Sequence, residues 1–228
     1  MFIIPTKANK QHNYAVQLVD DIRRFNQEEL IVVVDSDSED KSYHKELEKY
    51  TNVIVEDVKH KNYALGSYWY CYKKYPKEKF YHCLHDTMRI KSNIDFLKEK
   101  ELSVLFNFDR VAGMANNIAY CEFQCKKTRF SYHPNGKGVY GPIFFCSSVV
   151  MEKLQNEGFM EIYPTTKHEA SCTEWLMGFA FESLGYDLNK CCLMGDILHE
   201  ESSGGRSGLF PHKTEWQYPI EKFYARRL

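Results

Sequence analysis

In Phe80-Tyr81-His82-Cys83-Leu84-His85-Asp86-Thr87-Met88, an apolar run of strand length leads directly into the polar tripeptide His85-Asp86-Thr87. The carboxyl ends of strands in an α/β sheet open on the ligand crevice, so an acidic residue there can carry chemistry. Such a carboxylate can hold a divalent cation, and the cation can hold a diphosphate. Asp is also a common turn-capping residue after a strand, and the tripeptide by itself favours that simpler role. The remainder of the chain shifts the balance.

Three strand–helix pairs precede this stretch and predict a mostly parallel sheet. Apolar runs predict the strands, and apolar residues at helical spacing predict the helices between them. The expected strands are 2–4, 30–34, 53–55 and 80–86, and the expected helices are 15–25, 43–50 and 62–75. The continuous apolar run at 30–34 is typical of a central strand that is buried on both faces. Right-handed crossovers then predict an α/β fold with a doubly wound, mostly parallel central sheet flanked by helices.

The second half of the chain is less regular. Its apolar runs predict strands at 104–108, 139–145 and 193–199. Helices are expected from Ser147 or Ser148 to Gly158, and over 174–184. Residues 200–208 are rich in Ser and Gly, so we expect a mobile loop there.

Length, charge and composition narrow the function classes. The 228 residues suit one large domain or two tightly merged lobes, with a substantial core. A formal net charge of -1 gives no general electrostatic footprint for nucleic acid or for an anionic membrane. The aromatic content of 15 % suits sugar or base stacking, although buried aromatic residues are the more common use.

The eight cysteines indicate buried thiols. No C-x-x-C pair occurs, and neither Cys121-x-x-x-Cys125 nor Cys191-Cys192 has a matching second pair, which argues against structural zinc. The first apolar run is too short for a signal peptide, and no segment has the length of a membrane span. We therefore expect a cytoplasmic protein in a reducing compartment.

Three polar segments are expected to share one edge of the parallel sheet. These are Pro5-Thr6-Lys7, Asp35-Ser36-Asp37 and His85-Asp86-Thr87, each at the end of a predicted strand. The chain has no Gly-x-Gly-x-x-Gly after the first strand and no Gly-x-x-x-x-Gly-Lys-Ser/Thr motif. Because carboxylates are present and a glycine-rich phosphate-binding loop is not, we expect any bound phosphates to be held through a metal ion that the carboxylates bind. Ordinary loop solvation explains any one of these segments, but explains all three less well.

Two further features could carry chemistry. Ser171-x-x-Glu174 fits a capping box at the start of an apolar helix, and a carboxylate at a helix start could equally serve as a general base. Trp175 could be a platform for a sugar ring or simply part of the core. His199 follows an apolar run and precedes the glycine-rich stretch, which makes it a candidate metal ligand.

The order of these features resembles the GT-A family of nucleotide-sugar glycosyltransferases. The matching segments are Ile4-Pro5-Thr6-Lys7, Val34-Asp35-Ser36-Asp37, Asn62 to Ser67, Leu84-His85-Asp86-Thr87, Gly138 to Phe144 with Ser147-Ser148, Thr173-Glu174-Trp175 through Leu184-Gly185-Tyr186, and His199. The resemblance spans roughly residues 1–200. It implies a single domain over 1–228, with a nucleotide-binding half at 1–100, a smaller irregular acceptor-binding half at 101–200, and a mobile loop and tail at 201–228.

The resemblance also implies roles for individual residues. The implied nucleotide-binding residues are Pro5, Thr6, Lys7, Asp35, Asp37, Gly66, His85 and Asp86. The implied acceptor-binding residues are Tyr140, Gly141 and Trp175, with Glu174 as the catalytic base and Asp86 and His199 as ligands of Mn²⁺ or Mg²⁺. The implied reaction transfers a sugar, from a UDP-sugar by preference, to a hydroxyl of a glycan or glycoprotein. The loop around Arg206 would fold over the donor. Small soluble members of this kind occur in bacteria and large DNA viruses, which extends the expected location to a host cytoplasm.

Two departures from the family pattern leave alternatives open. His85 stands where the Asp-x-Asp metal motif has its first Asp, so metal dependence is open. Trp175 stands where an acidic pair has its second member, so Glu174 is the single candidate base and the stereochemical class is open, with inversion weakly favoured. The alternative functions are a nucleotidyltransferase that makes a sugar nucleotide and a non-catalytic sugar- or protein-binding relic of the fold. The former would normally carry a Gly-rich basic loop after the first strand, and Asn9-Lys10-Gln11 is no such loop.

Overall fold

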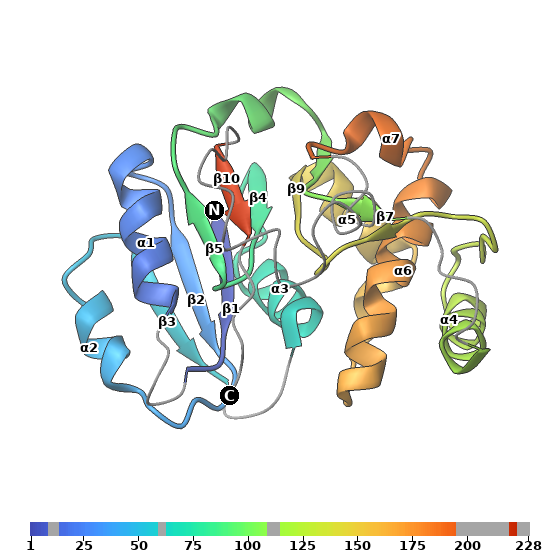
Figure 1. Cartoon of the computed structure of the whole chain (residues 1–228), viewed down its shortest axis with the longest axis horizontal. Helices are drawn as coiled ribbons and strands as arrows, with labels where there is room; N and C mark the ends of the chain where they lie inside the picture. Colours follow the sequence, from blue (N-terminus) through green and yellow to red (C-terminus); the bar gives the residue numbers. More distant parts are fainter. Residues whose placement is uncertain (9–13, 59–62, 109–114, 195–218, 223–228) are drawn as a thin grey trace, which may run out of the picture.

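A mixed six-stranded sheet forms the centre of the protein (Figure 1). A computed structural model describes residues 1–8, 14–58, 63–108, 115–194 and 219–222. The strand order in the sheet is β3-β2-β1-β4-β9-β6. The strands are β1 (Phe2–Thr6), β2 (Ile31–Asp35), β3 (Val53–Asp57), β4 (Phe80–Cys83), β6 (Leu102–Val104) and β9 (Phe144–Ser147).

The first four strands run parallel, as predicted from their apolar runs and the helices between them. β1 pairs with β2 on one side and with β4 on the other, and β2 pairs with β3. Every residue of β2 is buried, which confirms the interpretation of its apolar run as a central strand. β9 runs antiparallel to both of its neighbours, β4 and β6. The sheet is therefore mostly parallel but mixed.

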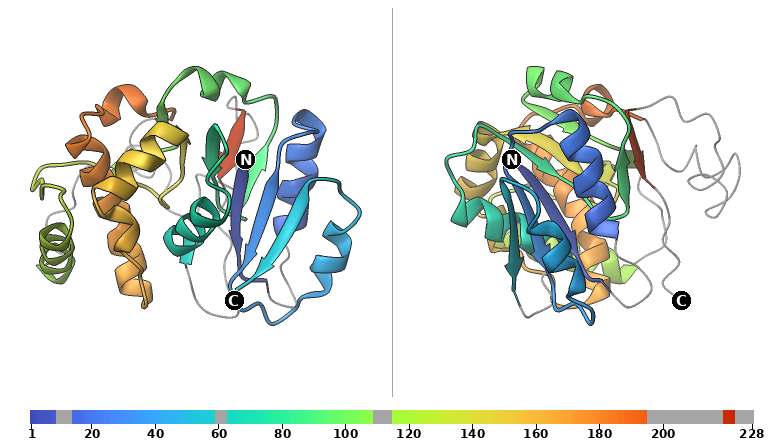
Figure 2. Two further views of the ribbon diagram at one scale, coloured as in Figure 1. Left: turned by 180° about the vertical axis from the view of Figure 1, so that it is seen from behind. Right: turned by 90° about the vertical axis from the view of Figure 1, so that its left-hand side faces the viewer.

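Helices cover both faces of the sheet (Figure 2). Alternate residues of β1 and β2 point to opposite faces, so Phe2 and Ile4 join one core cluster and Ile3 joins the other. α1 (Tyr14–Phe25) and α2 (Ser42–Leu47) cover the face of Phe2 and Ile4. α3 (Tyr63–Lys74), α5 (Ser148–Asn156) and α6 (Lys167–Ser183) cover the face of Ile3.

Two strands predicted for the second half are each divided in the structure. The run 104–108 contributes its start to β6, and its end forms β7 (Asn107–Phe108). The run 139–145 contributes to β8 (Gly138–Val139) and to β9, with a turn at Gly141 between them. β7 and β8 pair with each other in a separate two-stranded sheet. The prediction of one continuous strand in each region was wrong, because the segments that form β7 and β8 leave the central sheet and pair with each other.

The predicted start of the helix that contains Glu174 was also wrong. α6 begins at Lys167, seven residues earlier, with Thr166 as N-cap and a complete capping box to Glu169. The Ser171 hydroxyl instead donates to the carbonyl oxygen of Lys167 within the helix. Glu174 lies in the helix interior, so its carboxylate is available for contacts with other elements.

The remaining described elements are two strands, two α-helices and two 3₁₀ helices. They are β5 (Met88–Ile90), β10 (Ile220–Lys222), α4 (Ala115–Lys127), α7 (Leu188–Cys191) and the 3₁₀ helices η1 (Asp95–Glu99) and η2 (Phe159–Glu161). β5 and β10 form an antiparallel pair. Among the described helices, none combines the length and the apolar character that a membrane crossing requires. All eight cysteines are free thiols, and six of them are buried.

Candidate functional site

The carboxyl edge of the parallel strands brings together polar residues from β1, β2 and the segment after β4. Thr6 and Asp35 are Cα partners at the ends of β1 and β2. β4 ends at Cys83, earlier than the predicted 80–86, but the amide of Leu84 still donates to Ile3 and keeps the chain aligned with β1. Thr6 Oγ1 then donates to Asp86 Oδ2 over 2.9 Å. The parallel sheet thus places residues 80 positions apart in direct contact.

Asp35 organises the loop that follows β2. Its carboxylate is fully buried and accepts hydrogen bonds from Ser38 N (2.8 Å) and from the His44 side chain (2.6 Å). Ser38 Oγ in turn accepts from the Ala8 amide over 2.8 Å. Burial opposes ionisation of Asp35, but hydrogen bonds from Ser38 and His44 outweigh it and lower the pKa of this carboxyl. Asp35 is therefore a positioning residue for the loop.

The other predicted nucleotide-binding residues surround this loop with different exposure. Asp37 is exposed and adopts a positive φ of 62°, which turns the chain back after β2. Pro5 and Lys7 are partly exposed on either side of Thr6. Gly66 is buried near the start of α3, where Tyr68 donates from its hydroxyl to the carbonyl oxygen of Leu84. α3 is thereby fixed beneath the segment that leads to Asp86.

Glu174 reaches the same edge from α6. Its Oε1 accepts a hydrogen bond from the Gly141 amide over 3.0 Å. Gly141 has a φ of +63° and lies against the segment after β4: a Cβ built on it would sit 3.4 Å from His85 Cε1. His85 therefore lies close to the glycine that holds Glu174, while the next residue, Asp86, is held by Thr6. The predicted base, Glu174, and the predicted ligand of the donor diphosphate, Asp86, are thus both held near Gly141 and His85.

The aromatic acceptor candidates line this region from the second half. Trp175 follows Glu174, is partly exposed, and packs edge-on against Phe108 of β7 with ring centroids 5.8 Å apart. Tyr140 is partly exposed beside Gly141 and packs edge-on against Phe106 at 6.5 Å. Both rings combine a packed side with accessible surface, as a platform for a sugar ring requires.

The oxygen ligands at this edge suit a hard divalent cation that is coordinated mainly by the phosphates of a bound nucleotide. Mg²⁺ in phosphate sites commonly uses one or two protein carboxylates and completes its shell with phosphate oxygens and water. Asp86, partly exposed at the strand end, can supply one such carboxylate. Within the described residues, no three or more His, Cys, Asp or Glu side chains gather in a metal-binding arrangement. His199 and Arg206 lie outside the described residues, so their roles remain predictions.

Two residues near the edge were absent from the sequence interpretation. His44 belongs to α2 and pairs with Asp35 across nine positions. The only sequence signal for it is a histidine at the start of a short helix, which is too common to be informative. Lys222 in β10 reaches Thr87, beside Asp86, from 135 positions away, and no sequence pattern links the two.

The comparisons with known proteins add a distant structural likeness. No family model and no curated protein matches the chain. Among solved structures, TarS 1–349 of S. aureus matches with a TM-score of 0.43 and 15 % identity, over 78 % of this chain and 55 % of that one. A longer TarS structure matches with a TM-score of 0.46 and 12 % identity, over 78 % and 33 %. TarS 1–349 in complex with UDP-GlcNAc gives 0.44 and 15 %, over 78 % and 52 %. The chain thus spans about half or less of each of these TarS structures.

Proposed function

We propose that the protein is a GT-A-type glycosyltransferase that uses a nucleotide-sugar donor. The observation that carries this proposal is the arrangement at the carboxyl edge: Thr6 holds Asp86, the Gly141 amide holds Glu174, and His85, next to Asp86, lies close to Gly141. A sugar transferase needs a group for the donor diphosphate and a base for the acceptor hydroxyl within one site. The proposal rests on these side chains of this chain rather than on likeness to other structures.

In this proposal, the loops after β1 and β2 bind the nucleoside. Asp37 is the exposed carboxylate that can accept from ribose hydroxyls, while buried Asp35 shapes the loop through Ser38 and His44. Asp86 would hold Mg²⁺ or Mn²⁺ against the diphosphate. When bound, that cation supplies positive charge to the leaving nucleoside diphosphate. A UDP-sugar is the preferred donor, as the resemblance implies.

Glu174 would act as the base in an inverting transfer. The Gly141 amide holds one of its carboxylate oxygens and so fixes the orientation of the side chain. The acceptor oxygen forms a bond to the anomeric carbon as its proton passes to Glu174. The bond between that carbon and the donor's β-phosphate oxygen breaks, and its electron pair leaves with the nucleoside diphosphate. Trp175 and Tyr140 would receive the acceptor, a glycan or a glycoprotein.

Thermal unfolding with a panel of nucleotides tests the donor site. The panel is UDP, GDP and their sugars, each with and without Mn²⁺. A ligand at 100 times its dissociation constant stabilises the folded protein by about 2.7 kcal/mol, which is a readily measured shift. We expect stabilisation by one nucleotide family, lost in Asp86→Ala. Asp20→Ala is the matched control, because Asp20 is an exposed carboxylate whose ion pair with Lys49 is long, at 4.0 Å.

The outcomes separate the alternatives. Stabilisation that requires Mn²⁺ and Asp86 supports the metal-assisted site, and stabilisation without metal supports a metal-independent transferase with His85 in the altered motif. If no nucleotide stabilises the wild-type protein, the transferase proposal fails. The non-catalytic binding role then becomes the better account.

A further inference from the structure

The C-terminal strand β10 delivers a lysine to the carboxyl edge of the sheet. β10 pairs antiparallel with β5, with Ile220 opposite Ile90 and Lys222 opposite Met88. Because β5 begins two positions after Asp86, this register places Lys222 at the end of β5 that lies nearest to the candidate donor site. The Lys222 ammonium group contacts Thr87 Oγ1, on the residue next to Asp86.

Lys222 differs from a second lysine beside this two-stranded sheet. Lys91, which directly follows β5, is 42 % exposed at its side chain and forms an ion pair with Glu221 at 2.8 Å. Lys222 is only 8 % exposed, and one contact of its charged end is the neutral hydroxyl of Thr87. Burial of a lysine is uncommon because removing an ammonium group from water costs free energy. Lys222 is therefore a buried positive charge beside the strand end, whereas Lys91 is an ordinary surface charge.

We propose that Lys222 binds the β-phosphate of the donor's diphosphate, an inference that rests on the proposed function. A lysine is a common phosphate ligand because its ammonium group acts as a compact point charge. Charge develops on the β-phosphate oxygen as its bond to the anomeric carbon breaks and the electron pair moves onto that oxygen. A fixed ammonium group in a largely water-excluded place stabilises this charge more than it would in bulk water. Lys222 can do so with or without a cation on Asp86.

The structure assigns the tail a part in the donor site that the sequence interpretation did not contain. The sequence predicted a mobile loop and tail over 201–228, and the part expected to fold over the donor, 202–208, lies outside the described residues. Within the tail, β10 forms a strand whose last residue, Lys222, contacts the segment after β4. The diphosphate would then be held between Asp86 of the N-terminal half and a lysine from the end of the chain.

Calorimetric titration with a nucleoside diphosphate and its nucleoside tests this proposal. The probes are UDP and uridine, or GDP and guanosine if the guanine nucleotide is the one that stabilises the protein. The full chain is titrated as wild type and as Lys222→Met, Lys222→Arg and Lys91→Met, each in Mg²⁺ and in EDTA. We expect Lys222→Met to weaken diphosphate binding at least tenfold and to leave nucleoside binding unchanged. Lys222→Arg should retain part of the diphosphate affinity, and Lys91→Met should match the wild type.

The failure of this inference is distinct from the failure of the proposed function. If the wild type binds the diphosphate and Lys222→Met binds it equally well, the role of Lys222 is overturned and the donor site stands. If both probes weaken equally, Lys222 only supports the local structure and the inference is overturned. If the wild type binds neither probe, the proposed function itself fails and the inference fails with it. Lys222→Gln, which can still donate to Thr87, replaces Lys222→Met if that variant does not fold.

Discussion

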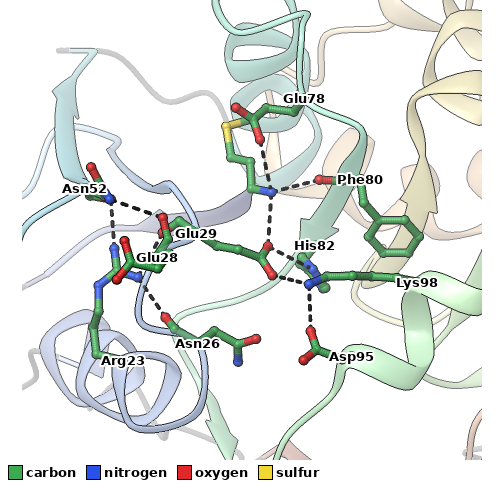
Figure 3. Close-up of polar contacts among 11 residues, drawn as sticks. Arg23, Asn26, Glu28, Glu29, Asn52, Glu78, Phe80, His82, Asp95 and Lys98 are labelled. Atoms are coloured by element: carbon green, nitrogen blue, oxygen red, sulfur yellow. Dashed lines mark hydrogen bonds and ion pairs between the residues drawn. The ribbon is translucent and has the colours of Figure 1, made fainter.

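At the amino edge of the central sheet, charged groups neutralise one another, whereas at the carboxyl edge Asp86 accepts from a hydroxyl, Glu174 accepts from a backbone amide, and both residues remain partly exposed. Figure 3 shows the amino-edge network, which is centred on Glu29. The Glu29 carboxylate contacts Lys98, the Met1 amine at 3.4 Å and the His82 ring at 3.5 Å. Asp95 adds a second contact to Lys98 at 2.6 Å.

Both edges contain carboxylates, but those at the amino edge are paired with cations, whereas Asp86 and Glu174 at the carboxyl edge can still bind a ligand. The pKa of Glu29 lies far below its usual value because hydrogen bonds from His82 and Lys98 outweigh the opposing effect of burial. At the carboxyl edge, Asp86 and Glu174 each receive a hydrogen bond from a neutral donor, and both side chains keep accessible surface. We infer from this comparison that the ion pairs of the amino edge stabilise the fold, while the carboxyl edge holds Asp86 and Glu174 in place with accessible surface.

The largest expected effect is at the carboxyl edge, in Glu174→Gln. Loss of the base should lower turnover by about 10²–10⁴-fold, because the acceptor proton no longer has a carboxylate to receive it. Stability and nucleotide binding should be unchanged. Steady-state release of the nucleoside diphosphate from the donor sugar measures this. Near-normal turnover would show that Glu174 is structural and would remove the difference between the two edges.

The next effect is at the amino edge, in Glu29→Gln. The neutral amide leaves Lys98 and the buried Met1 amine without their shared anion, and we expect a stability loss of about 2 kcal/mol. Urea unfolding measures it. Nucleotide affinity should not change, because the network is at the opposite edge. An equal loss of nucleotide affinity would contradict the assignment of this edge to stability alone.

His82 predicts how stability depends on pH. Complete burial, partly offset by Glu29, lowers the pKa of His82 to about 4, against an ordinary value of 6.5. The unfolded state therefore binds the proton first, and stability falls as pH drops from 6.5 toward 4, by about 2 kcal/mol at pH 5. His82→Phe, which can still stack on Phe2, should lose this slope. Glu29 contributes a separate loss only at lower pH, because its folded pKa is depressed and its stabilisation is complete above its unfolded pKa.

Two glycines with positive φ give the smallest and most selective comparison. A Cβ on Gly141 (φ +63°) would lie 3.4 Å from His85 Cε1, and the Gly141 amide holds Glu174, whereas a Cβ on Gly185 (φ +88°) would meet no atom within 4 Å. Replacement by Ala should cost about 1 kcal/mol at either position because of the left-handed backbone. Only Gly141→Ala should also lower turnover, by about tenfold, as the amide shifts from Glu174. Equal turnover in both variants would show that the Gly141 contact has no catalytic consequence.

The sequence predicted the first half of the fold well because its signals are local. The continuous apolar run at 30–34 and the predicted strand at 80–86, of which 80–83 form β4, are enough to define parallel strands together with the amphipathic helices between them. The resulting edge brought Thr6 and Asp86 together, although Asp35 proved to be buried within its own loop. Exposure of a strand-end carboxylate depends on side chains such as His44, which the strand pattern does not reveal.

The second half was less predictable because competing local signals occur there. Thr166-x-x-Glu169 and Ser171-x-x-Glu174 both match a capping box, and only the first one caps α6. The choice frees Glu174 to meet Gly141, a contact across 33 positions that no local pattern encodes. The splitting of the run 104–108 between β6 and β7 likewise depends on pairing with β8. Long-range pairing determined these features.

Amide hydrogen exchange with and without the nucleoside diphosphate tests the central claim most directly. The claim is that the carboxyl edge binds the donor and the amino edge does not. Bound nucleotide should slow exchange at amides of the carboxyl edge, such as Ala8, Ser38 and Gly141, which already lie in its hydrogen-bond network. Amides of the amino edge, such as Phe2 and Ile31, should exchange at unchanged rates. Protection confined to the amino edge, or spread equally over both, would contradict the account.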